Sequence, residues 1–364
     1  MRVVLDISQA AYANTGVGVY TIELARALKE LRPNAIAFFF GSLRQSPPDG
    51  LTPINRFPLP PAALDFLWNR FHVLGPDYLL DHFDLWHASD WTQPPTAKKI
   101  VTTVHDLAPF LFPAEHHPTI RAVHGRKMKW VVKEADNIIC VSNSTKQDLM
   151  RLFNVEEHRI VVIPEAARGI FGPQTDEAVK SVKEKYHLPQ QYLLAVGTVQ
   201  PRKNYERLFK AFSLMRKPPH LVIVGGIGWG EPPAFPERTI HLPSVELADL
   251  PALYAGAIAL VYPSLYEGFG LPLLEAMSVG TPVVASDTSS MPEVGGSAAL
   301  YVNPEDVEDM RKTLEIVCDL KAAERNDRIR RGRIHAKKFS WKKTAEQTLA
   351  VYQAILPSFL PKRR

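Results

Sequence analysis

Short runs of β-branched residues alternate with segments of helical pattern along most of the chain, in two successive series. Strands are predicted at residues 3–7, 36–40 and 100–104 in the first series, and at residues 192–196 and 220–224 in the second. Strands separated by helices of this length indicate βαβ units, whose strands form parallel sheets. We therefore expect an α/β protein with two Rossmann-like, doubly wound domains that face each other across a ligand-binding cleft.

The junction between the two series is expected after residue 172. The alternation lapses through Gly169-Ile-Phe-Gly-Pro and resumes with a helical segment at residues 175–186. A chain of 364 residues also exceeds the roughly 250–300 residues at which a single core stops growing. We predict an N-terminal domain at residues 1–172 and a C-terminal domain at residues 173–340, with a last helix at residues 341–356 that packs back on the N-terminal domain.

Two local features set further expectations. The proline-rich stretch 47–61 is predicted to be a surface loop. A late helix is predicted to begin at Pro304, with Asn303 as its N-cap, because proline is favoured at the first helical position.

Composition excludes several classes of protein. No apolar run approaches the roughly 20 residues that span a bilayer, and the opening Met1-Arg-Val-Val-Leu-Asp does not resemble a signal peptide. The net charge of +5 is modest, and no long basic block interleaved with aromatic residues marks a nucleic-acid groove. Cys140 and Cys318 lie far apart and offer no metal-ligand spacing. We expect a cytoplasmic protein with no nucleic-acid partner.

A basic segment stands out on one predicted helix. Five basic residues and Trp130 lie between Arg121 and Lys133, and Lys362-Arg-Arg ends the chain. One interpretation is a solvated helix face followed by a frayed tail. The other is peripheral contact with the anionic inner face of a membrane, or contact with a lipid-linked acceptor.

The segment after one predicted buried strand carries the most chemical information. The strand ends near Tyr262, a loop with two glycines follows, and a helix begins at Leu271, where the next residue is a proline suited to a helix start. Loop amides and the positive end of the helix form an anion site suited to a diphosphate. Glu267 precedes the loop and Glu275 lies about one turn inside the helix, so two carboxylates flank this site and can accept sugar and ribose hydroxyls. Taken alone, Glu275 could merely complement the helix dipole.

The residues from Glu267 to Glu275 read EGFGLPLLE. This pattern is the E-x7-E motif of the retaining glycosyltransferases of family 4 (glycosyltransferase group 1), which have the GT-B fold, and the chain resembles that family. Further matches follow in order along nearly the whole chain: Thr15-Gly-Val-Gly-Val-Tyr, Thr103-Val-His-Asp-Leu, Val141-Ser-Asn-Ser, Val162-Ile-Pro, Val196-Gly-Thr-Val-Gln-Pro-Arg-Lys-Asn and Leu253-Tyr. The G-T-x-x-P-R-K-N element is most similar to the mannosyltransferase-type branch.

The resemblance implies a catalytic group of four residues. Glu267 is expected to face the hydroxyls of the donor sugar, and His105 to contact that sugar from the N-terminal domain. A lone histidine at a strand end is otherwise more often structural. Arg202 and Lys203 are expected to neutralise the diphosphate. Thr198 stands where the commoner family pattern has an arginine, so Arg202 is the candidate replacement.

The resemblance also implies donor-binding residues. Phe269, Gly270 and Leu271 are expected to offer backbone amides, and Glu275 to hold the ribose. Gly16 follows the first strand and is expected near the donor phosphate or the acceptor, because glycine lets a ligand approach the backbone closely. The C-terminal domain would then bind the donor and the N-terminal domain the acceptor.

The expected activity is transfer of a hexose, first mannose from GDP-mannose, to a saccharide or lipid-linked acceptor in polysaccharide biosynthesis. The family interpretation is a front-face, retaining transfer that needs no cofactor and no metal. Two alternatives stay open: a GT-B sugar-nucleotide epimerase or phosphorylase, and a non-catalytic nucleotide-sugar binding protein. A dehydrogenase is disfavoured because neither half carries a complete glycine fingerprint.

Overall fold

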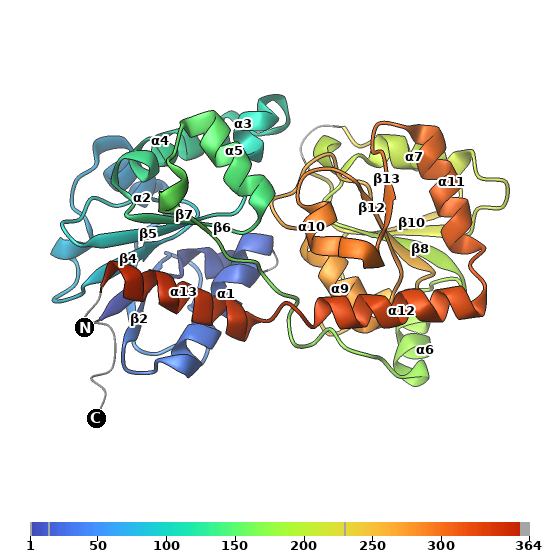
Figure 1. The fold of residues 1–364 in the computed structure, drawn as a ribbon, viewed down its shortest axis with the longest axis horizontal. Helices are drawn as coiled ribbons and strands as arrows, with labels where there is room; N and C mark the ends of the chain where they lie inside the picture. Colours follow the sequence, from blue (N-terminus) through green and yellow to red (C-terminus); the bar gives the residue numbers. More distant parts are fainter. Residues whose placement is uncertain (1, 14, 229–230, 357–364) are drawn as a thin grey trace. The chain divides into compact units, whose positions relative to one another are not determined.

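The computed structural model describes residues 2–13, 15–228 and 231–356. The chain divides into two compact units, one formed by Met1–Glu165 with Ser340–Arg364 and the other by Ala166–Phe339. Each unit contains a parallel sheet with helices on both faces (Figure 1). The predicted α/β class with two Rossmann-like domains is therefore confirmed.

The sheet of the first unit has the order β3-β2-β1-β4-β5-β6-β7, and each neighbouring pair is parallel. Its strands are β1 (Val3–Asp6), β2 (Ile36–Gly41), β3 (Ile54–Phe57), β4 (Leu85–Ala88), β5 (Lys99–Val104), β6 (Asn137–Cys140) and β7 (Ile160–Val162). The chain runs outward from β1 to β3 on one side and from β4 to β7 on the other. The carboxyl ends of β1 and β4 thus mark the switch point at which ligands of such sheets bind.

The helices of the first unit cover both faces of this sheet. They are α1 (Gly16–Leu31), α2 (Pro61–Leu64), α3 (Ala108–Leu111), α4 (Pro118–Glu134), α5 (Asn143–Phe153) and α13 (Trp341–Ile355), with a π-helical segment η2 (Asp65–Phe71) after α2. The C-terminal helix α13 packs along α1 (Figure 1). It is held by the Tyr352 hydroxyl at 2.5 Å from His87 Nδ1 and by the Thr344 hydroxyl, which donates to the carbonyl oxygen of Pro164 at 2.7 Å.

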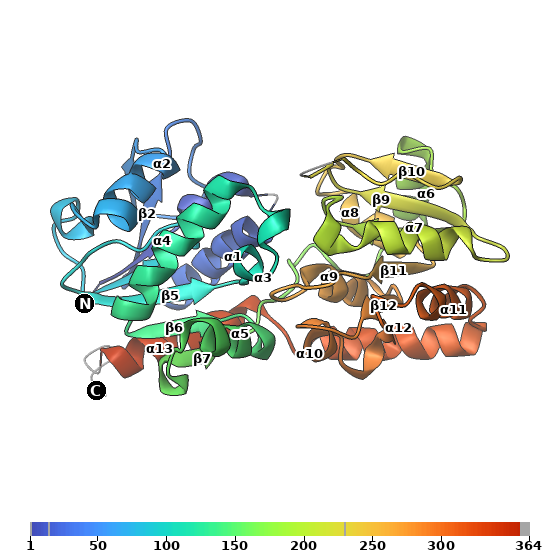
Figure 2. The ribbon, with the colours of Figure 1, turned by 90° about the horizontal axis from the view of Figure 1, so that it is seen from above.

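The sheet of the second unit has the order β10-β9-β8-β11-β12-β13 and is also parallel. Its strands are β8 (Tyr192–Val196), β9 (His220–Val224), β10 (Thr239–Leu242), β11 (Ala259–Tyr262), β12 (Val283–Ser286) and β13 (Leu300–Val302). Its helices are α6 (Asp176–Lys185), α7 (Tyr205–Ser213), α8 (Leu250–Ala255), α9 (Leu271–Val279), α10 (Met291–Gly295), α11 (Val307–Cys318) and α12 (Ala322–Ala336). α9 lies against α12 (Figures 1 and 2). The switch point of this sheet lies between β8 and β11.

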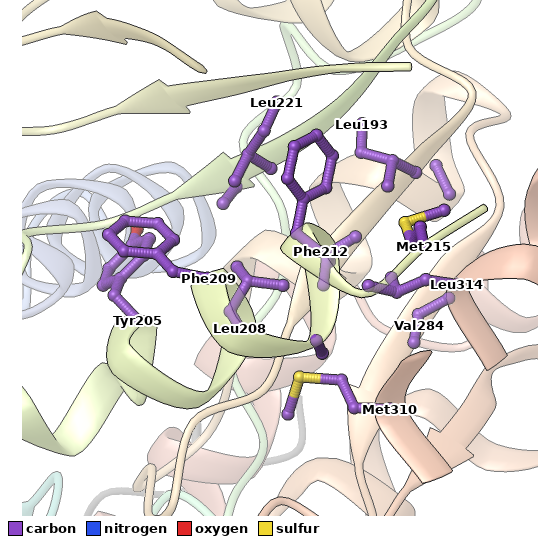
Figure 3. Close-up of a cluster of buried hydrophobic side chains, with 14 of the residues drawn as sticks. Leu193, Tyr205, Leu208, Phe209, Phe212, Met215, Leu221, Val284, Met310 and Leu314 are labelled. Carbon is purple, nitrogen blue, oxygen red and sulfur yellow. The ribbon is translucent and has the colours of Figure 1, made fainter. Parts of the chain in front are cut away.

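One face of the second sheet is buried under α7 and α11. Phe212 of α7 and Leu314 of α11 are almost completely buried, and they belong to one apolar cluster with Leu193 of β8 and Leu221 of β9 (Figure 3). Apolar residues three and four positions apart put one stripe of each helix on the sheet. This packing fixes α7, and with it the loop between β8 and α7.

The junction between the units differs from the expected one. It lies between Glu165 and Ala166, not after residue 172, and the second unit ends at Phe339. The segment after Ala166 belongs to the second unit because the Phe171 ring packs edge-on against Tyr254 at 5.8 Å. A break in periodicity therefore marked the end of the regular elements and not the domain boundary.

Two local expectations were wrong. The proline-rich stretch 47–61 contains β3, which pairs with β2 at the edge of the sheet, where neighbouring prolines are tolerated. The helix expected from Pro304 begins at Val307 and is capped by Asp306, whose carboxylate accepts hydrogen bonds from the amides of Glu308 and Asp309. Asn303 instead accepts a hydrogen bond from Glu305 within the preceding turn. Among the described residues, no helix is both long and apolar enough to cross a membrane.

Candidate functional site

The candidate site of the second unit lies where β8 and β11 end side by side. After β8, Gly197 adopts a φ of +138°, and the chain continues to a short 3-10 turn, Pro201–Lys203. Asn204 then takes a left-handed conformation and donates to the carbonyl oxygen of Pro263 at 3.1 Å. Leu265, in the loop after β11, donates its amide to the carbonyl oxygen of Arg202 at 2.9 Å. The turn that carries both predicted cations is therefore bonded to the loop that carries Glu267.

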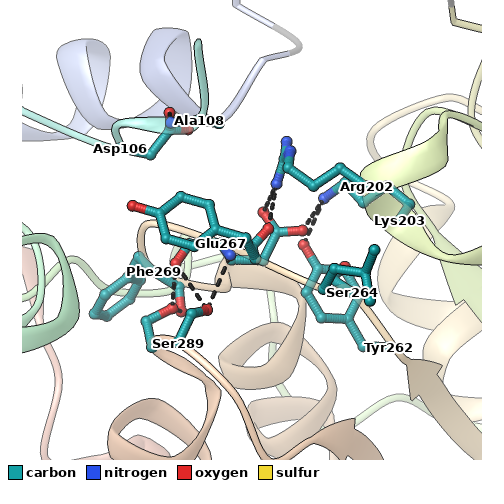
Figure 4. A network of polar contacts seen from close by, with 12 residues as sticks. Asp106, Ala108, Arg202, Lys203, Tyr262, Ser264, Glu267, Phe269 and Ser289 are labelled. Carbon is teal, nitrogen blue, oxygen red and sulfur yellow. Dashed lines mark hydrogen bonds and ion pairs between the residues drawn. The ribbon is translucent and has the colours of Figure 1, made fainter. Parts of the chain in front are cut away.

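Glu267 forms ion pairs with both of these cations (Figure 4). Lys203 Nζ lies 2.6 Å from Glu267 Oε1, and Arg202 Nη1 lies 3.0 Å from Oε2. The same lysine donates to the Tyr262 hydroxyl at 2.7 Å and lies 4.8 Å from the centre of that ring. Arg202 also donates to the carbonyl oxygen of Tyr266. The structure thus brings three of the predicted residues into one contact group.

Glu267 is ionised in this environment. Burial alone would raise its pKa, but the positive charges of Arg202 and Lys203 more than compensate and lower the pKa to about 2. Tyr262 shows the opposite effect, since burial and the charge of Glu267 raise its pKa well above the ordinary value. At neutral pH the group therefore contains two cations, one anion and a neutral tyrosine.

Two serines hold the loop that follows Glu267. The amide of Glu267 donates to Ser289 Oγ at 3.0 Å, and Ser290 Oγ lies 2.6 Å from the carbonyl oxygen of Phe269. Gly270 then adopts a φ of +109°, which favours glycine, and α9 begins at Leu271. The first amides of a helix have no partner within the helix, so the backbone at Gly270 and Leu271 suits an anion.

Glu275, on α9, lies in a different environment from Glu267. It is 6 % exposed and accepts a hydrogen bond from the Tyr254 hydroxyl at 2.9 Å. Burial raises its pKa to about 6, although the Tyr254 hydrogen bond and the charge of Arg168 act in the opposite direction. Glu275 can therefore accept hydrogen bonds from hydroxyl groups, and its charge changes near pH 6.

Thr198 stands where the commoner family pattern has an arginine, and Arg202 is the candidate replacement for that charge. Thr198 is exposed, whereas Arg202 is 9 % exposed and directed at Glu267. Arg202 is therefore not a surface residue at a helix start. Its guanidinium supplies a second positive charge beside Lys203.

In the first unit, Gly16 begins α1, after the N-cap Thr15, whose hydroxyl accepts the amide of Gly18 at 3.1 Å. No atom would lie within 4 Å of a Cβ at Gly16, so there is open space beside this backbone. The strict steric requirement for glycine lies instead at Gly18, where a Cβ would meet the carbonyl oxygen of Tyr12 at 2.1 Å. The space at Gly16 is compatible with a ligand.

His105, also in the first unit, directly follows β5 and has a partner that sequence reasoning missed. Its Nδ1 lies 3.0 Å from Oε1 of Glu165, which lies three residues beyond the end of β7. Glu165 had no comparable signal in the sequence, because β7 is only partly buried and Glu165 lies beyond Ile163 and Pro164. His105 and Glu165 therefore form a buried pair within the first unit.

The basic segment on α4 is only partly a surface feature. Lys127 is 2 % exposed, and its ammonium donates to the carbonyl oxygen of Asp90 at 2.9 Å. Arg126 forms an ion pair with Asp65. The interpretation as a solvated helix face therefore fails for Lys127, which lies in the core of the unit. The terminal Lys362-Arg-Arg lies outside the described residues.

No group of three or more His, Cys, Asp or Glu side chains able to hold a metal ion occurs in residues 2–13, 15–228 and 231–356. The positive charges at the site come from Arg202 and Lys203.

The sequence matches two family models in these same regions. Residues 14–167 match the model described as Glycosyltransferase Family 4, and residues 177–335 match the model described as Glycosyl transferases group 1. A curated relative, the O-antigen chain mannosyltransferase B of Escherichia coli, is 34 % identical, with 98 % of this chain and 100 % of that protein covered. The chain belongs to glycosyltransferase family 4.

A second relative is consistent with this assignment, and a solved structure shows the fold. The serotype-specific mannosyltransferase WbdA of Escherichia coli is 31 % identical over 78 % of this chain, which spans 38 % of that longer protein. The solved structure of sucrose-phosphate synthase from Thermosynechococcus elongatus superposes with a TM-score of 0.75 at 20 % identity, covering 98 % of this glycosyltransferase and 100 % of that chain. The fold is GT-B, as the sequence predicted.

The first prediction concerns Glu267→Gln. Without the carboxylate, two largely buried cations lose their partner, so the free energy of unfolding at pH 7 should fall by on the order of 3–5 kcal/mol. The folded pKa of about 2 lies below the ordinary 4.5, so this stabilisation is complete above pH 4.5 and is lost as the pH falls toward 2. Urea unfolding at pH 7 and pH 3 measures both effects. Equal stability of parent and variant at pH 7 would show that the ion pairs are not formed.

The second prediction concerns Glu275→Gln, the matched control in the same segment. The folded pKa of about 6 lies above the ordinary 4.5, so the buried charge costs stability as the pH rises between these values. The amide should remove this cost, of on the order of 2 kcal/mol, and its carbonyl can still accept from Tyr254. The variant should therefore be more stable than the parent at pH 8 but not at pH 4. A pH-independent difference in urea unfolding would contradict the proposed burial effect.

Proposed function

We propose that this glycosyltransferase is a retaining mannosyltransferase that uses GDP-mannose and extends a saccharide or lipid-linked acceptor in polysaccharide biosynthesis. The choice of mannose is supported by the names of the O-antigen and serotype-specific mannosyltransferases to which the chain is similar. The choice of a nucleotide-diphosphate donor is supported by the charge of the site in the second unit.

The main observation behind the proposal is that two cations contact the carboxylate of Glu267 beside the start of α9. Arg202 and Lys203 both form ion pairs with Glu267, and one positive charge remains in excess. A diphosphate brings about two negative charges, and it competes for the same cations next to the amides at Leu271. Binding of the diphosphate then releases the oxygens of Glu267 from their ion pairs, and these oxygens can accept the hydroxyls of the sugar.

The remaining residues take the roles that the family match suggests. Glu275 accepts the ribose hydroxyls, and the backbone at Phe269 and Gly270 approaches the donor. In the first unit, His105 contacts the donor sugar, and Gly16 leaves room for the donor phosphate or the acceptor. These assignments concern binding and orientation, which supply much of the barrier reduction in a transfer between two bound substrates.

The transfer itself is a substitution at the anomeric carbon. The bond from this carbon to the diphosphate oxygen breaks, a bond to the acceptor oxygen forms on the same face, and the proton of the acceptor hydroxyl passes to the departing diphosphate oxygen. Arg202 and Lys203 stabilise the charge that develops on the leaving group. The residues of the chain can supply this charge without a metal.

The third prediction identifies the donor and tests the reaction. In a panel of nucleotide sugars, GDP-mannose should stabilise the folded protein, by about 2.7 kcal/mol at a concentration 100 times its dissociation constant. It should also transfer mannose to a saccharide acceptor with retention of configuration. Turnover of the donor to an epimer, or phosphorolysis without an acceptor, would favour the rival GT-B enzymes. Binding without turnover would favour a non-catalytic protein.

The variant that links this activity to the site is Lys203→Ala. An interaction that strengthens as charge develops affects turnover more than ground-state binding. Single-turnover transfer at saturating donor should therefore fall by about 10²–10³. The control is Lys210→Ala, which removes a 60 % exposed lysine paired with Glu206 on the same unit and should transfer at the parent rate. An unchanged rate in Lys203→Ala would contradict the proposed site.

We also propose that the first unit contacts the anionic inner face of a membrane. Large apolar side chains are unusually exposed in and after η2, with Phe71 55 %, Leu74 54 % and Tyr78 79 % exposed. Next to them, the His72 ring stacks on Trp130 of α4 at 3.6 Å, and exposed lysines on either side of that tryptophan extend over it. An apolar surface bordered by aromatic residues and cations suits the interface of an anionic bilayer.

The fourth prediction tests this surface by sedimentation with vesicles. The parent should bind vesicles that contain phosphatidylglycerol and not pure phosphatidylcholine, and Lys129→Glu/Lys133→Glu should abolish binding. Lys210→Glu/Lys312→Glu makes the same change of charge at exposed positions of the second unit and should bind normally. Equal loss of vesicle binding in both variants would show that binding depends only on the net charge of the protein. No binding by the parent would refute membrane contact.

A further inference from the structure

The contact between His105 and Glu165 determines which nitrogen of the imidazole carries a proton. Both side chains are nearly buried, with 11 % and 5 % exposed, and the distance from Nδ1 to Oε1 is 3.0 Å. An ionised carboxylate only accepts hydrogen bonds, so Nδ1 is the donor. Nε2 is therefore the ring nitrogen left to form a hydrogen bond with a ligand.

Other contacts fix the orientation of the ring. The Tyr20 ring packs edge-on against His105 with centres 4.5 Å apart and an angle of 85°. The Thr145 hydroxyl donates to the backbone carbonyl oxygen of His105 at 3.2 Å. A 180° flip of the ring would put Cδ2 in the place of Nδ1 and break the contact with Glu165, so this contact selects the observed orientation of the ring.

The charged groups around His105 favour the protonated ring. Burial lowers the pKa of His105, but the hydrogen bond and charge of Glu165 raise it, Asp90 raises it further and Lys127 lowers it, with a net increase. His87, which is also buried nearby, has a pKa of about 3 and stays neutral. Glu165 is thus the neighbour that contributes most to keeping the imidazole positively charged.

We propose that Glu165 is a positioning residue that keeps His105 doubly protonated, so that Nε2–H donates a hydrogen bond to an oxygen of the bound substrate. In this arrangement His105 cannot be a general base, because a base would need a free lone pair on Nε2. It instead offers a hydrogen bond and a positive charge to the bound substrate. The inference rests on the proposed glycosyl transfer for its substrate, but the state of the histidine can be tested without one.

The first experiment is a proton NMR titration of His105, assigned by the loss of its signal in His105→Gln. Replacing the carboxylate by an amide in Glu165→Gln should lower the pKa of His105 by about 1–3 units, the usual effect of a neighbouring opposite charge. Glu165→Asp, which retains the charge, should restore most of the shift. The matched control is Glu134→Gln, since Glu134 also accepts a hydrogen bond from a histidine of the same unit, His72, at 2.8 Å.

The second experiment follows the rate of mannosyl transfer with pH. The folded pKa of His105 is raised, so a reaction that needs the protonated ring runs below this pKa and slows as the pH rises through it. In Glu165→Gln this decline should begin at least about one pH unit lower, with rates that approach the parent value at low pH. Glu134→Gln should show the parent profile. A structural role alone would lower the rate at all pH values.

The outcomes separate this inference from the proposed function. If Glu165→Gln left the titration of His105 or the position of the decline unchanged, the inference would be wrong while the transferase activity stood. A rate that rose with pH through the pKa of His105 would identify a general base and would also overturn it. If the titration shifted as expected but no nucleotide sugar supported transfer, the proposed function would fail, and with it the catalytic part of the inference.

Discussion

The carboxylate of Glu267 connects the loops at the ends of two neighbouring strands. Its partners Arg202 and Lys203 follow β8, whereas Glu267 follows β11, and these two strands pair directly at the switch point of the sheet. The order of the strands therefore creates the ion pairs. Three charged groups can be buried together because they compensate one another, and none of them is stable there alone. In the proposed function, a diphosphate takes the place of the glutamate as the partner of these two cations.

The two glutamates of the EGFGLPLLE segment show how environment divides the roles of identical side chains. Burial raises the pKa of both, yet Glu267 titrates at about 2 and Glu275 at about 6. The difference comes from Arg202 and Lys203, which lie against the first glutamate, whereas the second has the Tyr254 hydroxyl and a more distant cation. Glu267 is thus a permanent anion at neutral pH. Glu275 is a titratable hydrogen-bonding group suited to hydroxyls.

Much of this organisation could be predicted from local patterns, and the errors have a common cause. Alternating strands and helices indicated both sheets, and the motif around Glu267 indicated the family. The interpretation of Lys127 as a surface cation was wrong because its burial depends on packing against the segment of Asp90. Glu165 was missed because its proximity to His105 depends on the order of strands, with β5 and β7 on either side of β6. The edge strand β3 had no clear pattern because it is only partly buried.

The sequence by itself determined the fold class, the position of the glycine-rich turn before α9 and the residues that can carry charge in the site. These depend on periodicity and backbone conformation over a few neighbouring residues. Only the tertiary structure decided which charges meet and what they become. Lys203 and Glu267 are 64 residues apart in the chain, yet 2.6 Å separates their charged atoms. Coulombic interaction and desolvation depend on distance and on the exclusion of water, and both are properties of the folded chain.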